Sequence, residues 1–333
     1  MNRPASKRKT RLTTIGVTLT LVLGSTAGPS HAAASSYPKT LAFLNGMFVS
    51  GKYVEGFTPG KPDFGFTLEA MLQRLGGGMS SARQSAAIKT TILDNTNIGT
   101  SQNRHGYLFD TNGDLKLGAA GKYLFAAAVF KAGNNQNRLG ILGLAKTEIN
   151  PDGALRNADG NAFDYSWLTL GLASNGDLSA ACRVSTALAR LPRQDGGWGY
   201  DTTNSTSESQ TDSTGIALQA LGATSGTCSK SQEATKYSAI RAAIKYLKQT
   251  QIAGNHWEAW GDFDTNGTAY AAMGLRAVRQ PISAISAWLA SKIAPDGGLR
   301  SAWSNGAGDT YATAQSYVAL RGLSYLNLAG LNH

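Results

Sequence analysis

Carboxylates are the side chains in this sequence whose types and spacing could support chemistry. Aspartates recur about every fifty residues, each at the start of an apolar run, at Asp63, Asp114, Asp164, Asp212, Asp264 and Asp309. A loop carboxylate can act as a general acid or base, and two carboxylates can share that work. Glu208 and Asp212 lie close together in the polar stretch TNSTSESQTD and are therefore the candidate catalytic residues.

The repeated aspartates also have a structural interpretation. An Asp side chain that precedes a helix accepts hydrogen bonds from the first free backbone amides and complements the helix dipole. Every helix needs a cap, whereas a catalytic acid is needed at one place only. The repetition therefore favours capping at each of the six positions, including Asp212.

Other kinds of chemistry find less support among the residues. With four histidines in 333 residues, a nucleophilic triad or a histidine-rich metal site is not expected, and no cofactor is expected. The segment FDTNGDLK places Asp110, Asn112 and Asp114 at alternate positions, as in the first half of a calcium loop. Leu115 stands at the usual glycine position, and FDTNG recurs at 263–267, so an Asn-Gly turn is favoured over a calcium site.

Aromatic residues gather in the connections between the apolar runs, and six of them could line a ligand site. A flat ring can support a glycan ring or another flat apolar ligand. Large aromatics near helix ends also commonly pack inward and hold neighbouring helices together. Both interpretations apply to Tyr107, Trp198, Tyr200, Trp257, Trp260 and Trp303.

These residues must be positioned by two kinds of helix that alternate along the chain. The Asp-led runs are rich in Ala, Gly and Leu, as in LGAAGKYLFAAAVF and STGIALQALGA, and small residues allow helices to approach closely. Between them lie amphipathic segments, predicted at 41–49, 82–93, 139–149, 178–191, 237–247 and 282–293. The pattern predicts an all-α fold, an (α/α)6 toroid with six outer and six inner helices.

In a ring of helices that alternate in direction, all the connections from outer to inner helices lie at the same end of the ring. The outer-to-inner connections are long and carry the aromatic residues, so we expect them to build one functional face around the N-termini of the inner helices. The ring should close by packing of residues 41–75 against residues 282–323.

Three segments, QDGGWG, PDGGLRSAW and QIAGNHWEAW, each followed by an apolar run, resemble the prenyltransferase and squalene-cyclase repeat. The resemblance implies the α/α-toroid fold of terpenoid cyclases and protein prenyltransferase β subunits, which the helical domain of cobalamin carriers shares. It implies an activity less firmly.

We expect that the chemistry of those families is not preserved in this chain. In the Asp-x-Asp-Asp-Thr-Ala motif of class II cyclases, Asp262 and Asp264 match but Thr265 replaces the next Asp, and neither Cys182 nor Cys228 follows an Asp by two residues, as a prenyltransferase zinc ligand would. We expect a ligand-binding module for a glycan, an isoprenoid or another small apolar ligand. The alternative is a carboxylate-dependent enzyme, either a polysaccharide hydrolase or lyase, or a terpenoid-cyclase-like enzyme.

The N-terminus predicts export. The basic start MNRPASKRKTR, the apolar run 15–22 and the stretch HAAASS are typical of a secretory signal peptide, residues 1–34, cleaved near Ala32 to Ala34. One toroid domain, residues 35–333, then follows, without a transmembrane segment. In an oxidising compartment Cys182 and Cys228 are expected to form a disulfide, with two free thiols as the alternative.

The charge of the mature chain bears on its partners. The net charge of +10 includes the basic residues of the signal peptide, and the remaining chain has no block of consecutive Lys or Arg. Nucleic acid is therefore not an expected partner. We expect a monomer that binds a small molecule or glycan, with a cell-surface protein as a further possible partner.

Overall fold

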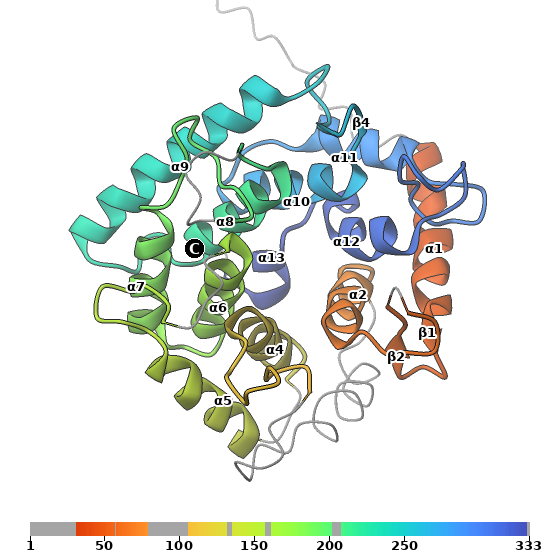
Figure 1. Ribbon diagram of the computed structural model, residues 1–333. Coiled ribbons are helices and arrows are strands. Elements are labelled where there is room, and N and C mark those ends of the chain that lie inside the picture. The colour runs from red at the N-terminus through yellow and green to blue at the C-terminus, as the bar shows by residue number, and fades with distance from the viewer. Residues whose placement is uncertain are drawn as a thin grey trace, which may run out of the picture.

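Six inner helices form a closed ring. The computed structural model describes residues 31–56, 58–78, 106–131, 135–156, 161–201 and 208–331. The inner helices pack against one another in chain order, and the last returns to the first (Figure 1). They are α2 (Phe64–Gly76), α4 (Leu117–Val129), α6 (Ala162–Ser174), α8 (Thr211–Ala223), α10 (Thr265–Ala277) and α12 (Thr310–Leu320). The predicted all-α toroid is confirmed.

Outer helices surround this ring. In the described part of the chain they are α1 (His31–Gly46), α5 (Asn135–Thr147), α7 (Leu178–Leu188), α9 (Lys230–Thr250) and α11 (Ser283–Ser291). The outer helix expected at 82–93 lies outside the described residues. Helix α1 contacts α11 and α12, so the first and last hairpins meet as expected. No helix in the described ranges has the length and apolar character needed to cross a bilayer.

Glycines let two pairs of inner helices approach closely. A Cβ on Gly121 of α4 would lie 2.3 Å from the backbone of α6, and one on Gly171 of α6 would lie 2.6 Å from the Gly121 carbonyl. The same reciprocal contact joins Gly215 of α8 and Gly274 of α10, where a Cβ on Gly274 would lie 2.4 Å from the Gly215 carbonyl. Any larger side chain would force these helices apart.

Three of the six repeated aspartates cap their helices as expected. Asp63, Asp264 and Asp309 accept hydrogen bonds from backbone amides in the first turns of α2, α10 and α12, at 2.8, 2.9 and 2.7 Å. Each of these residues has extended backbone geometry and immediately precedes its helix.

The capping prediction is wrong for the other three. Helix α4 begins after Lys116, so Asp114 lies too early to reach its first amides. Asn161 caps α6 by accepting from the Asp164 amide at 2.8 Å, which places Asp164 inside the first turn. Asp212 is likewise inside α8, which begins after Gln210 with no side-chain cap. The carboxylates of Asp164 and Asp212 are thus not needed as caps.

Threonines fix the loops to the inner helices. In four repeats a buried Thr hydroxyl in the first turn accepts the amide of a buried apolar residue from the preceding connection. The pairs are Thr67 with Val54 at 2.9 Å, Thr214 with Trp198 at 3.0 Å, Thr268 with Trp257 at 3.1 Å and Thr313 with Leu299 at 2.7 Å. The four loop residues therefore occupy equivalent positions in the ring.

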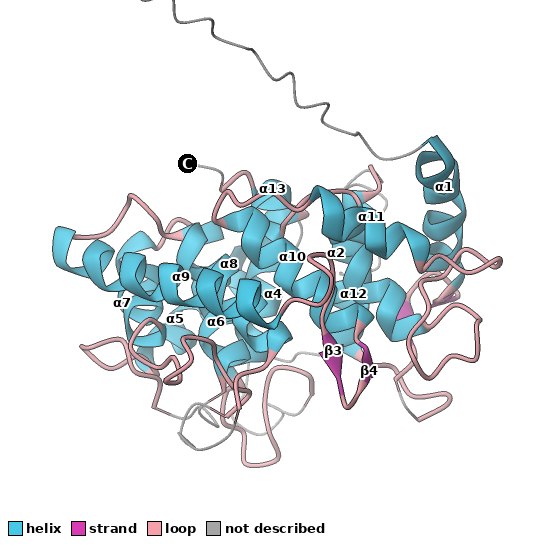
Figure 2. Ribbon diagram, turned by 90° about the horizontal axis from the view of Figure 1, so that it is seen from above, coloured by secondary structure: helices cyan, strands magenta, loops and turns pink. Residues whose placement is uncertain are grey.

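Side chains fill the axis of the toroid. The short helix α13 (Tyr325–Ala329) lies at the centre of the ring in Figure 1, and Figure 2 shows it at the end opposite the β3–β4 hairpin. The hydroxyl of Tyr325, which is fully buried, accepts from Gln73 at 3.1 Å. Nearby, buried Glu69 accepts hydrogen bonds from Tyr270, from Lys122 at 3.2 Å and from Gln315 at 3.3 Å. Within the described residues, the axis therefore contains a hydrogen-bonded polar network beside the packed rings of Phe125 and Trp167.

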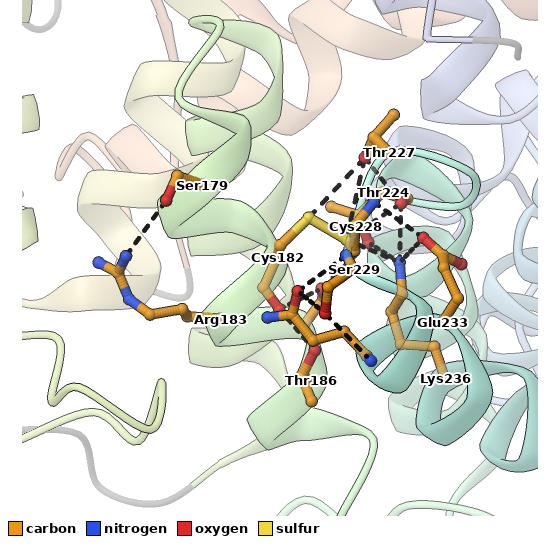
Figure 3. The surroundings of a disulfide bond; sticks show 12 residues. Ser179, Cys182, Arg183, Thr186, Thr224, Thr227, Cys228, Ser229, Glu233 and Lys236 are labelled. Atoms are coloured by element: carbon orange, nitrogen blue, oxygen red, sulfur yellow. Dashed lines mark hydrogen bonds and ion pairs between the residues drawn. A yellow bond between two sulfur atoms is a disulfide. The ribbon is translucent and has the colours of Figure 1, made fainter.

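A disulfide ties two neighbouring outer elements together. Cys182 on α7 is bonded to Cys228, just before α9, which confirms the expected pairing (Figure 3). Beside it, the buried Lys236 donates to the Thr224 carbonyl at 2.7 Å and to Glu233 at 3.0 Å, and lies 3.0 Å from the Cys228 sulfur. These contacts fix the connection between α8 and α9.

Candidate functional site

A two-stranded hairpin carries the most exposed aromatic residue of the described chain. Strand β3 (Glu258–Ala259) pairs with β4 (Asp262–Phe263), and Trp260 and Gly261 form the turn with φ of 53° and 82°. Such turns need positive φ at both central residues, which is unfavourable for tryptophan. Trp260 nevertheless occupies the tip, 89% exposed, and the hairpin projects from the ring (Figure 2). A second hairpin joins β1 (Phe48–Val49) to β2 (Tyr53–Val54).

The β3–β4 hairpin borders a hollow of about 340 Å³ at the N-termini of α8, α10 and α12, which we call the mouth pocket. Its aromatic wall includes Trp260 and Trp303, and Trp303 is 72% exposed. Three carboxylates also line it, those of Asp212, Asp264 and Asp309. The pocket thus combines exposed rings with a concentration of acids, at the end of the ring where the functional face was expected.

Two of these acids also have structural roles. Asp309 uses one carboxylate oxygen as the cap of α12 and accepts the Ser301 hydroxyl with the other at 2.9 Å. For Asp264, burial raises the pKa above its ordinary value, although hydrogen bonds from the amides of Gly267 and Asn266 act in the opposite direction. Both side chains are held in fixed positions by these bonds.

Asp212 differs from both. It accepts hydrogen bonds from its neighbour Ser213, from the amide at 2.6 Å and from the hydroxyl at 3.3 Å. Burial raises the pKa of Asp212, and the negative charge of Asp264 raises it further, against the hydrogen bonds from Ser213. A carboxyl group that keeps its proton to a higher pH than usual can serve as a general acid.

Glu208 does not join this site. It is exposed and is not among the residues that line the mouth pocket, so the structure does not bring Glu208 and Asp212 together as an acid pair there. The charge of Glu208 acts instead on Tyr246. The pKa of the Tyr246 phenol is raised to about 12, mainly by burial and further by the negative charges of Asp195, Asp212 and Glu208.

Two of the six predicted ligand-binding aromatics are core residues. Trp198 and Trp257 are 0% and 1% exposed, and their indole N–H groups donate to the carbonyls of Leu188 and Leu247 at 3.0 and 3.1 Å. Both the ring and the polar atom are therefore used in packing a connection against an outer helix. The expectation that these two form a ligand platform is wrong, and the packing interpretation holds for them.

The other aromatics are divided among three places. Trp260 and Trp303 line the mouth pocket. Tyr200 is exposed outside it, with its ring centre 6.4 Å from that of Phe163. Tyr107 borders a separate hollow of about 410 Å³ that Lys61 and Asp63 also line.

The Asp110 segment is a turn. One carboxylate oxygen of Asp110 accepts the amides of Asn112 and Asp114, each at 2.9 Å, and Gly113 has a φ of 84°. The Asn-Gly turn interpretation therefore describes this segment. Within the described ranges, no three His, Cys, Asp or Glu side chains are grouped so that they could hold a metal ion.

Sequence reasoning missed several residues of the mouth pocket. Phe263 and Tyr311 line it beside the tryptophans. Asp309 was assigned to capping, and Asp264 to capping and to an incomplete cyclase motif. Tyr311 also stacks on Phe66 of α2, with ring centres 4.1 Å apart. These residues could have been predicted from the ring arrangement, because the N-termini of adjacent inner helices must lie side by side.

Comparison with known proteins places the fold. No family model matches the chain, and no curated protein matches its sequence. Among solved structures, a type II terpene cyclase from Scytonema is similar with a TM-score of 0.60 at 14% identity, covering 87% of this chain and 96% of the cyclase. A protein from Actinoplanes gives 0.59 at 15% identity, covering 90% and 99%.

An unsaturated glucuronyl hydrolase from Bacillus sp. GL1 is also similar, with a TM-score of 0.50 at 14% identity, covering 89% of this chain and 96% of the hydrolase. At these identities the likeness shows the fold alone. This chain has the α/α-toroid fold that these enzymes share.

Proposed function

We propose that this protein binds a glycan at the mouth pocket. The observation that carries the proposal is that Trp260 and Trp303, both largely exposed, line one hollow together with three carboxylates. Tryptophan faces pack against the apolar faces of sugar rings, and carboxylates accept hydrogen bonds from sugar hydroxyls. The negative charge favours neutral sugars or sugars that carry an amino group over acidic ones.

An isoprenoid ligand fits this arrangement less well. The terpene cyclase from Scytonema has been solved in complex with geranylgeranyl dihydroxybenzoate as substrate. A long apolar chain needs an enclosed apolar cavity, but here buried Glu69, Tyr270 and Tyr325 occupy the axis of the ring. The mouth pocket itself is acidic.

A second candidate function is carboxylate-dependent cleavage of the bound glycan, by hydrolysis or lysis. Asp212 supports it, because this residue is not a cap and its pKa is raised by burial and by Asp264. Two neighbouring carboxyl groups with different proton affinities form the usual acid and base of such enzymes. The shared fold of the glucuronyl hydrolase is compatible with this activity.

Export is part of the proposal. The basic and apolar start of the chain and the disulfide between Cys182 and Cys228 support secretion. A monomer, and a cell-surface protein as a further partner, also belong to the proposal.

Binding and catalysis can be separated with four variants and a panel of neutral and amino-sugar oligosaccharides. Trp260→Ala and Trp303→Ala should weaken binding by about 1–3 kcal/mol each in calorimetric titration, while Tyr200→Ala, an exposed aromatic outside the pocket, should change little. Asp212→Asn should leave affinity nearly intact. If the protein is an enzyme, the same variant should lower turnover by about a hundredfold or more. Unchanged binding in both tryptophan variants would contradict the proposal.

A further inference from the structure

Positive charge is concentrated on α9 and at the end of α10, whereas the mouth pocket lies at the start of α10. Between residues 234 and 294 the only acids are Glu258, Asp262 and Asp264, which belong to the β3–β4 hairpin and the cap of α10. The same interval contains seven basic residues, Lys236, Arg241, Lys245, Lys248, Arg276, Arg279 and Lys292. Lys236 is buried beside the disulfide.

Five of these basic residues line two hollows along one side of α9, which forms the rim of the ring in Figure 1. The first, of about 730 Å³, lies between α9 and the end of α10 and reaches Leu326 of α13. The second, of about 410 Å³, continues along α9 toward Gln280. Together they form what we call the α9 groove, with the basic residues Arg241, Lys245, Lys248, Arg276 and Arg279.

The basic side chains of the α9 groove are available for a ligand. All five are exposed, and none of the described residues that line the two hollows is acidic. Lys248 donates to Gln280 at 3.4 Å, and Arg241 lies 5.8 Å from the centre of the Tyr237 ring. On α9, positions 237, 241, 245 and 248 lie on one helix face, so the charges follow a line.

The floor of the groove is apolar. Ile240, Val278 and Leu326 line the first hollow, and Ile244 lines the second. Tyr237, at one end, is 64% exposed. A ligand that matches this surface must offer apolar faces to the floor and negative charges to the rim. Inorganic polyphosphate has no apolar face, and a nucleic acid would find one exposed aromatic ring for its bases.

We propose that the α9 groove binds a linear acidic glycan, such as a chain of uronate residues, at a site separate from the mouth pocket. In such a polymer each ring has an apolar face and a carboxylate, which meets the groove's alternation of aliphatic floor and basic rim. The acidic mouth pocket, which would repel the same polymer, lies at the start of α10, whereas the groove borders its end.

The test is calorimetric titration of the whole protein with a hexamer of galacturonic acid. The acid form should bind, and affinity should fall when ionic strength rises from about 50 to about 200 mM, because exposed charges are screened. The fully methyl-esterified hexamer, which has the same backbone without charge, should bind at least about tenfold more weakly. Equal binding of the two forms would overturn the proposal.

Variants locate the site. The triple change Arg241→Gln, Lys245→Gln and Arg279→Gln should weaken the uronate hexamer about tenfold or more, since each exposed contact contributes modestly. The control Lys39→Gln with Arg190→Gln removes two exposed charges elsewhere and should leave affinity within about twofold. Unchanged affinity in the triple variant would refute the assignment.

Two further measurements distinguish a glycan site in the α9 groove from binding at the mouth pocket and from a nucleic-acid site. The variant Trp260→Ala/Trp303→Ala should keep its affinity for the uronate hexamer. A loss of affinity in this variant would show that the hexamer binds at the mouth pocket, and would overturn the proposal. A single-stranded DNA of equal net charge should bind more weakly at the same salt. If it binds more tightly, the groove is a nucleic-acid site and the glycan assignment fails.

Discussion

At the scale of single residues, Asp212 is unusual because the fold does not need its charge. Burial raises its pKa above the reference value of 3.8, so the folded protein binds a proton more tightly than the unfolded chain does. The contribution of Asp212 to stability is therefore lost as pH rises from about 4 through the raised pKa.

Asp212→Asn should then make the protein more stable at pH 7, with the advantage disappearing near pH 3.5. Denaturant titrations at both pH values would measure this, and Asp309→Asn, which replaces one good cap by another, should show little change. A variant that is less stable than the wild type at pH 7 would show that Asp212 supports the fold.

Thr268 gives a second prediction at this scale. Its buried hydroxyl accepts the amide of Trp257 at 3.1 Å, so Thr268→Val should leave a buried N–H without a partner and cost about 1–3 kcal/mol of unfolding free energy. Thr235→Val, which removes a hydroxyl from a solvent-accessible hydrogen bond to the Ser231 carbonyl on α9, should cost far less. Equal losses in denaturant titration would contradict the proposed role of the bridging threonines.

At the scale of helices, the caps separate what the sequence can predict from what it cannot. The recurrence of aspartate and the alternation of apolar and amphipathic runs predicted the inner helices and the ring. Which aspartate acts as a cap depends on a shift of two or three residues in where each helix begins, and periodicity does not resolve that. For this reason the sequence predicted Asp212 as the N-cap of its helix.

The tryptophans show the same limit. Trp198 and Trp260 both lie in outer-to-inner connections, yet one is buried and the other is at a hairpin tip. The DGG turn before Trp198 also precedes Leu299, and both residues pair with a helix threonine. The shared DGG turn could therefore have identified Trp198 as a core residue. The projecting β3–β4 hairpin follows no such repeated turn, so the sequence gives no basis for predicting it.

Helix packing provides a paired test at this scale. Gly215→Ala should destabilise by about 1–3 kcal/mol, because the added methyl group would lie 2.3 Å from the Tyr270 backbone on α10. Gly143→Ala, on outer helix α5 where nothing lies within 4 Å of the added carbon, should be neutral or slightly stabilising. Denaturant midpoints of both variants would measure this, and tolerance of Gly215→Ala would contradict the close approach of α8 and α10.

At the scale of the whole molecule, ring closure should make unfolding cooperative. Each inner helix is covered on both sides by its neighbours, so no repeat buries its apolar surface alone. Scanning calorimetry should show one transition, and two separated transitions would contradict a closed single domain.

The disulfide adds to that stability. Cys182 and Cys228 are 46 residues apart, and Cys182→Ser/Cys228→Ser should lower the unfolding free energy by about 3–4 kcal/mol. Chemical denaturation of the variant beside the oxidised protein measures this. A loss below about 1 kcal/mol would mean that Lys236 and its partners already hold this connection in place.

The contact between α2 and α12 also governs how the chain can be made. Phe66 and Tyr311 stack across that junction, so the nascent chain carries one half of the contact long before the other leaves the ribosome. Until then the growing polypeptide is an open horseshoe with an uncovered apolar edge. Helices α12 and α13 complete both the circumference and the axis, so their synthesis is the step at which the ring becomes protected from aggregation and proteolysis.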